Sequence, residues 1–151
     1  MQNERQNERQ NETLEWKLEQ AMEDKSNAFL FRESREQMQS CIRQVLVEEL
    51  GEVLSTHQIK NYLERLHGYR YLSNTQDLRH GAFLRWISLN EDEPKLKNGA
   101  HFCELKTDNE VVLVFKNHHR GTFFRVKMEE NIFFQKLTDQ QCLLMEAIAL
   151  F

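Results

Sequence analysis

Residues 81–137 alternate apolar and polar side chains in short runs, and turn-forming residues separate the runs. Alternation with a period of two is typical of β-strands, because successive side chains point to opposite faces of a sheet. The separating segments include residues 98–99, 107–109 and 118–121, which are rich in residues that favour turns. Short strands joined by short turns predict an antiparallel meander that curls into a small SH3-like barrel. The five predicted strands are 81–89, 100–106, 111–117, 122–128 and 131–137.

Helical periodicity dominates the residues that precede these strands. Apolar faces over residues 38–54 and 56–67 predict a helical hairpin or a helix-turn-helix, and ordinary packing of a hairpin is favoured. A capping box at 55–58 opens its second helix, and another at 138–141 opens a short C-terminal helix. The predicted fold class is therefore α+β, with N-terminal helices, a five-stranded antiparallel SH3-like barrel and a closing helix.

The change from helical to alternating pattern divides the chain of 151 residues. Residues 1–13 repeat Gln-Asn-Glu-Arg without an apolar face and are predicted to form a polar arm. Residues 14–68 form the predicted helical region, and residues 69–151 form the predicted small β-barrel domain with its closing helix. The polar stretch 69–80 is expected to connect the two parts.

Charge, hydropathy and cysteine content limit where such a chain acts. The formal net charge is −4, and no segment is strongly basic, so the usual electrostatic footprint for nucleic acid is missing. No apolar run is long enough to span a bilayer, and the polar start of the sequence does not resemble a signal peptide. The three cysteines are expected to be reduced thiols. The expected location is therefore intracellular (cytoplasm or nucleus) or a virion, and the protein is not expected to be secreted.

The helical pattern that begins at residue 14 suggests a contact surface. An apolar seam surrounded by Glu and Lys indicates a helix that packs on another surface, and the Trp lies beside that seam. The apolar run 28–31 either docks on the β region or marks a surface that contacts a partner. The predicted interaction residues of this helical seam are Leu14, Trp16, Leu18, Phe29 and Phe31.

Enzyme chemistry is not predicted from this sequence. His101 and Cys103 stand two residues apart on one strand face, but nothing supplies an oxyanion hole or a third orienting group. His118 and His119 are adjacent, so their side chains diverge and do not readily share one metal ion. We therefore predict no catalytic residues, no metal ligands and no cofactor.

The β region offers an alternative surface of aromatic and cationic side chains. Small barrels bind single-stranded nucleic acid or peptides through such faces, by stacking and charge. The competing interpretation is that half of the aromatic residues simply fill the core. The residues assigned to the nucleic-acid alternative are Arg79, Arg85, Trp86, Arg125 and Lys127.

Four segments within residues 77–137 together resemble a small β module found in proteins of large double-stranded DNA viruses. They are residues 77–87, 96–100, 123–126 and 132–136. Ala100 departs from the pattern, because a second glycine is expected after Gly99. The resemblance implies an accessory protein associated with a virion or with replication, and it carries over no catalytic residue.

Together these features predict a non-enzymatic protein–protein assembly or structural protein, such as a minor virion component. The expected partners are other protein subunits, in a homo-oligomer or a larger assembly. The alternative is a nucleic-acid-associated accessory factor that binds through the β face or through the helix 56–67.

Overall fold

A computed structural model describes the backbone of residues 2–150 and the side chains of residues 13–150. The chain forms two compact units, which are treated separately below. The helical unit consists of Met1–Arg35 and Leu137–Phe151, and the sheet unit is Glu36–Lys136. This division differs from the sequence-based one, because the two ends of the chain belong to one unit.

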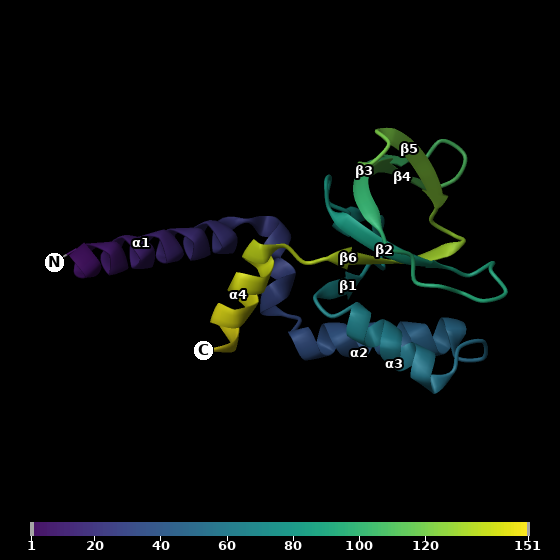
Figure 1. Cartoon of the computed structure of the whole chain (residues 1–151), viewed down its shortest axis with the longest axis horizontal. Coiled ribbons are helices and arrows are strands. Elements are labelled where there is room, and N and C mark those ends of the chain that lie inside the picture. Colours follow the sequence, from purple (N-terminus) through teal and green to yellow (C-terminus); the bar gives the residue numbers. More distant parts are fainter. Residues whose placement is uncertain (1, 151) are drawn as a thin grey trace. The chain divides into compact units, whose positions relative to one another are not determined.

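The sheet unit contains an antiparallel sheet in the order β1-β6-β2-β3-β4-β5 (Figure 1). Its strands are β1 (Tyr69–Tyr71), β2 (Phe83–Ser88), β3 (Ala100–Lys106), β4 (Val112–Asn117), β5 (Thr122–Lys127) and β6 (Asn131–Lys136). Strands β2 to β6 correspond to the five predicted strands, with ends that shift by a few residues. The α+β class is therefore confirmed.

Two predictions about the sheet were wrong. The described residues form six strands and not five, because β1 lies in the stretch 69–80 that the sequence indicated as a connection. The sheet is also open: β1 and β5 are its two edges and do not pair with each other. β1 pairs with β6, with Tyr69 opposite Lys136. This pairing joins residues far apart in the sequence, so no local pattern reveals it.

Side chains that alternate in direction along the central strands pack into two apolar cores, one on each face of the sheet. On one face, Ile87 and Phe134 pack with the apolar sides of α2 (Arg35–Leu50) and α3 (Thr56–Arg65). On the other face, the sheet curls around Trp86, Phe115 and Phe133. The Trp86 and Phe115 rings stack with centroids 4.7 Å apart. A register shift in β3 between residues 102 and 104 adds to this curl, because bulges bend a strand and increase its twist.

The helical hairpin of the sheet unit follows the predicted caps. Ser55 caps α3 by accepting a hydrogen bond from the Gln58 N–H, and the Gln58 side chain accepts one from the Ser55 N–H. Gly68, with φ of +83°, lets the chain leave α3 and enter β1. Tyr62 anchors the hairpin by donating from its hydroxyl to the Pro94 carbonyl at 3.0 Å.

The helical unit joins the beginning of the chain to its end. It contains α1 (Gln2–Glu23), the 3-10 helix η1 (Lys25–Phe31) and α4 (Asp139–Ala149), and α4 packs against both α1 and η1. Residues 2–13 of the predicted arm fall within α1, whereas Met1 and the side chains of residues 1–12 lie outside the described part of the chain. The predicted closing helix therefore packs within the helical unit, on α1 and η1.

A buried amide network fixes the packing of the helical unit. Asn27 is 2% exposed and Gln141 is 6% exposed. Asn27 donates from Nδ2 to the Ala21 carbonyl at 2.9 Å, and it accepts from Gln141 Nε2 at 3.1 Å. Gln141 also completes the capping box of α4 with Thr138. One amide pair therefore ties η1 to both long helices of the unit.

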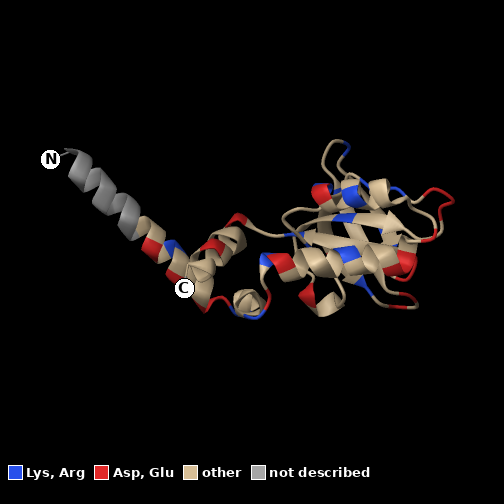
Figure 2. Ribbon diagram, turned by 90° about the horizontal axis from the view of Figure 1, so that it is seen from below, with Lys and Arg blue, Asp and Glu red and all other residues tan. Residues whose placement is uncertain are grey.

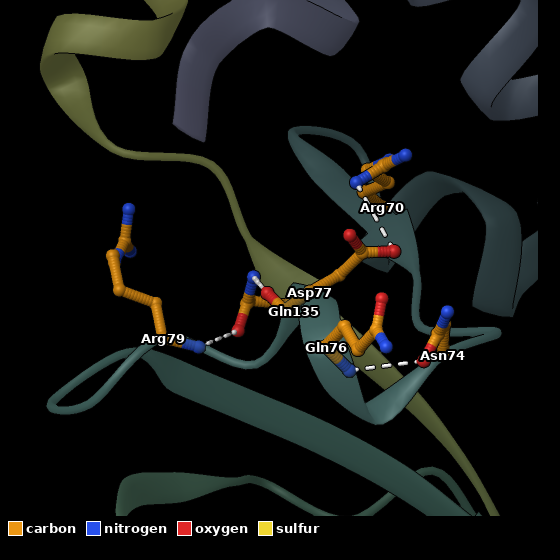
Figure 3. A network of polar contacts seen from close by, with 6 residues as sticks. All are labelled: Arg70, Asn74, Gln76, Asp77, Arg79 and Gln135. Carbon is orange, nitrogen blue, oxygen red and sulfur yellow. Dashed lines mark hydrogen bonds and ion pairs between the residues drawn. The ribbon is translucent and has the colours of Figure 1, made fainter. Parts of the chain in front are cut away.

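A second polar network holds the short connection between β1 and β2 (Figure 3). Gln135 on β6 accepts from the Arg79 N–H at 3.1 Å and donates from Nε2 to the Asp77 carbonyl at 3.0 Å. Arg70 lies 3.9 Å from the Asp77 carboxylate. Asn74 caps the intervening turn by accepting from the Gln76 N–H. A single strand side chain thus satisfies two backbone groups of this loop.

The two hydrogen bonds from the Gln135 side chain to the backbone of Asp77 and Arg79 are called the Gln135 clamp below, and replacement of Gln135 tests it. We expect Gln135→Ala to lower the free energy of unfolding by about 1–2 kcal/mol, because two hydrogen bonds to the loop backbone are lost. Chemical denaturation followed by circular dichroism measures the change. Gln76→Ala is the control, because the described bond of Gln76 uses its backbone N–H. Equal stability of the two variants would refute the clamp.

Candidate protein interaction surface

The helical unit exposes several large apolar side chains. Of the predicted seam residues, Leu14 is 44% exposed, Trp16 is 59% exposed and Phe31 is 54% exposed. Leu18 and Phe29 are half-buried. The structure therefore places all five seam residues in one compact unit and leaves three of them open to solvent.

Helical periodicity explains why Trp16 stays outside the packed side of α1. Leu14, Leu18 and Ala21 are spaced by four and three residues, so they share one stripe of the helix. Ala21 is fully buried and its carbonyl accepts a hydrogen bond from Asn27 of η1, which orients this stripe toward the rest of the unit. Trp16 follows Leu14 by two residues, about 200° around the helix. It therefore lies on the side of α1 opposite this stripe, where it is 59% exposed.

Two further exposed apolar residues of this unit were not assigned from the sequence. Met22 is 58% exposed and Leu150 is 85% exposed. Met22 belongs to the apolar pattern of residues 14–29, so its exposure could not be inferred from periodicity. Leu150 directly follows α4. In Figure 2 the described part of α1 carries both acidic and basic positions.

A shallow apolar hollow lies within the helical unit. It has a volume of about 280 Å³. Its floor is formed by Leu30 of η1 and by Met145, Ile148 and Ala149 of α4. Charged and polar groups surround it, among them Glu33, Ser34, Arg35 and Glu146. An apolar floor with a charged rim is the arrangement that receives an apolar side chain of a protein partner.

The residues assigned to nucleic-acid binding do not form one surface. Trp86 is only 8% exposed and packs between Phe115, Phe124 and Phe133, so its ring has no free face for a base. Arg125 and Lys127 lie on β5. Lys127 pairs with Glu110 at 3.4 Å and Glu130 at 3.8 Å, and these acidic neighbours raise its pKa.

Arg79 and Arg85 lie in other parts of the sheet unit, in the connection between β1 and β2 and on β2. The Arg79 backbone belongs to the Gln135 clamp. Arg85 is half-buried and donates from Nε to the Lys97 carbonyl at 2.8 Å. Burial lowers the pKa of Arg85, as does the nearby Arg65, whereas Tyr69 opposes this shift. The guanidinium of Arg85 therefore supports the loop before β3.

The histidines and cysteines of the sheet unit do not form a metal centre. Among residues 13–150, no three His, Cys, Asp or Glu side chains gather closely enough to hold a metal ion. His101 contacts the His118 ring with centroids 4.7 Å apart, and its Nδ1 lies 3.1 Å from the Gly81 carbonyl. His80 Nδ1 lies 2.6 Å from the Cys103 carbonyl. These contacts link the β1–β2 connection and the β4–β5 turn to β3.

Comparison of the chain with protein-family models, curated proteins and solved structures gives no match. Within the part of the chain that the structure describes, no helix combines the length and apolar character needed to cross a membrane.

Proposed function

We propose that this protein is a non-enzymatic assembly protein that joins protein subunits through its helical unit. The observation that carries this proposal is the exposure of large apolar side chains on one small unit. They are Leu14, Trp16, Met22, Phe31 and Leu150. Covering apolar surface is favourable by roughly 25 cal/mol per Å², so a protein partner at this unit would gain stability from each of them.

Trp16 is the strongest candidate anchor among these side chains. Tryptophan is enriched among the interface residues that contribute most to binding, and such anchors are surrounded by a polar rim. Trp16 is 59% exposed and stands among Glu15, Lys17 and Glu19, which are also exposed. A second copy of this chain is the partner that we propose, in a homo-oligomer or a larger assembly.

The geometry gives less support to the nucleic-acid alternative. That function requires an aromatic platform beside the cations, and Trp86 is buried in the core of the sheet unit. The resemblance of residues 77–137 to a viral β module agrees with an assembly role in a virion, which remains part of the proposal.

Charge placed in the helical surface tests the proposal. We expect the chain to show a mass above 18.2 kDa that rises with concentration in light scattering. The double substitution Trp16→Glu with Phe31→Glu should weaken association at least about 30-fold, because each places a carboxylate where an apolar contact forms.

The matched control is Ser40→Glu, which adds a carboxylate at an exposed position of α2 in the sheet unit. This variant should associate as the parent chain does. Two results would contradict the proposal: a parent mass that stays at 18.2 kDa over the whole concentration range, or equal association of the double variant and the control.

A further inference from the structure

Strand β5 is an open edge of the sheet with an unusual side-chain content. Among the described residues it pairs only with β4. It contains neither proline nor glycine, and it presents Phe123 at 63% exposure and Phe124 at 36% exposure. An exposed strand edge with unpaired backbone groups is a template for pairing with another strand.

The hydrogen-bond pattern shows which residues of β5 can pair outward. The Met128 N–H donates to the Val111 carbonyl at 2.9 Å, and the register continues from there with Val112 opposite Lys127. Hydrogen-bonded and non-hydrogen-bonded pairs alternate along an antiparallel ladder. Phe124 and Val126 therefore bond to β4, whereas the backbone groups of Phe123, Arg125 and Lys127 face the free edge.

The arrangement of charges selects one register for pairing with a second copy, because both registers place Phe123 opposite a cation but only one places two arginines opposite each other. Two copies of β5 can pair antiparallel around a two-fold axis in two registers that each match five residues of β5 with five of the copy. In one register the axis passes through Arg125, and in the other it passes through Phe124. An axis at Arg125 places this arginine opposite the same residue of the copy, and like charges directly opposite each other are destabilising. An axis at Phe124 places Phe123 opposite Arg125 twice, where a guanidinium can lie on an aromatic ring.

We infer that two copies of this chain pair through their β5 edges, with the two-fold axis at Phe124. The same register sets Lys127 opposite Gly121, which has no side chain to collide with it or to repel it. It also brings the two Phe124 rings together beside Phe115, on which Phe124 already stacks at 5.5 Å. The open sheet of one copy thereby continues into the sheet of the other.

This contact does not depend on the helical surface. Phe124 lies in the sheet unit, whereas Trp16 and Phe31 lie in the helical unit. Failure of the β5 pairing is therefore seen in the crosslinking below, while failure of the proposed function is seen in the mass of the Trp16→Glu, Phe31→Glu variant.

Cysteine crosslinking tests the register. In a background of Cys41→Ser, Cys103→Ser and Cys142→Ser, we expect Phe124→Cys to form a disulfide-linked dimer under mild oxidation. Residues facing each other in a non-hydrogen-bonded antiparallel pair have Cβ atoms close enough for a disulfide after a small adjustment. Thr122→Cys, also exposed on β5, should crosslink only at the rate of random collision.

Three results would overturn the inference. Phe124→Cys could crosslink no faster than Thr122→Cys, which would also be the result if a strand of another protein occupied this edge. Arg125→Cys could crosslink fastest, which would select the other axis. Finally, Arg125→Pro removes an edge N–H but no bond to β4, so it should weaken dimerisation at least about tenfold beyond Arg125→Ala; equal effects of the two substitutions would exclude pairing through the backbone.

Discussion

Replacing Gly99 by alanine is expected to destabilise the sheet unit by about 2–4 kcal/mol, the largest effect of a single added methyl group that we predict. Gly99 has φ of +105°, a conformation that residues with a Cβ rarely adopt. A Cβ atom there would also lie 2.5 Å from the Leu84 carbonyl oxygen and 2.7 Å from the Phe83 ring. The backbone carbonyl belongs to β2 and cannot move without disturbing the sheet.

Gly121 provides the matched control for this prediction. Its φ is +63°, and an added Cβ would have no neighbour within 4 Å. Gly121→Ala should therefore lower the free energy of unfolding by only about 1 kcal/mol, because alanine is disfavoured in the left-handed backbone conformation. Thermal and chemical unfolding of both variants measures the difference. Equal destabilisation would show that the close approach of Leu84 and Phe83 to Gly99 contributes nothing.

Replacing Asn27 by alanine is expected to lower the stability of the helical unit by about 2–4 kcal/mol. The substitution removes the donor to the Ala21 carbonyl and leaves the buried Gln141 amide without its acceptor. A buried polar group without a partner costs more than the hydrogen bond contributes. Hydrogen exchange should report the change as faster exchange in α1 and α4.

The control for Asn27 is Asn90→Ala, the same substitution at an exposed position of the sheet unit. It should leave exchange in α1 and α4 unchanged. If the amides of α1 and α4 exchange as slowly in Asn27→Ala as in the control, then apolar packing alone holds the helical unit together and the amide pair contributes little.

The features of the fold that sequence reasoning predicted are those with local causes. Ser55 and Thr138 cap the helices that their capping boxes indicated, because a capping box is complete within four residues. Strands β2 to β6 follow the alternation and the turns between them. In each case the residues that decide the structure are neighbours in the chain.

The features that sequence reasoning missed depend on contacts between distant residues. Strand β1 has three residues and exists because β6 lies beside it. Asn27 and Gln141 are 114 positions apart, and neither residue type signals burial. The sheet remains open because its two edge strands, β1 and β5, do not pair with each other. The lengths of the turns do not determine whether the edges pair.

The candidate surface was predicted in part for the same reason. Helical periodicity indicated Leu14, Leu18 and Phe29, with Trp16 beside their seam, and the apolar run 28–31 indicated Phe31. How far each side chain is exposed depends on how α1, η1 and α4 pack together. Trp86 belongs to the same alternating pattern as its neighbours, and only the curl of the sheet buries it against Phe115.

The most direct test of the assembly account is the quenching of tryptophan fluorescence by acrylamide at increasing protein concentration. The chain contains two tryptophans: Trp16 is 59% exposed and Trp86 is 8% exposed. Only Trp16 should be readily quenched in dilute solution. We expect this accessible fraction to fall as the mass of the protein rises, because a second subunit covers Trp16. In the Arg125→Pro variant, whose β5 edge pairing is weakened, an accessible fraction that stays constant over a range in which the mass increases would contradict the account.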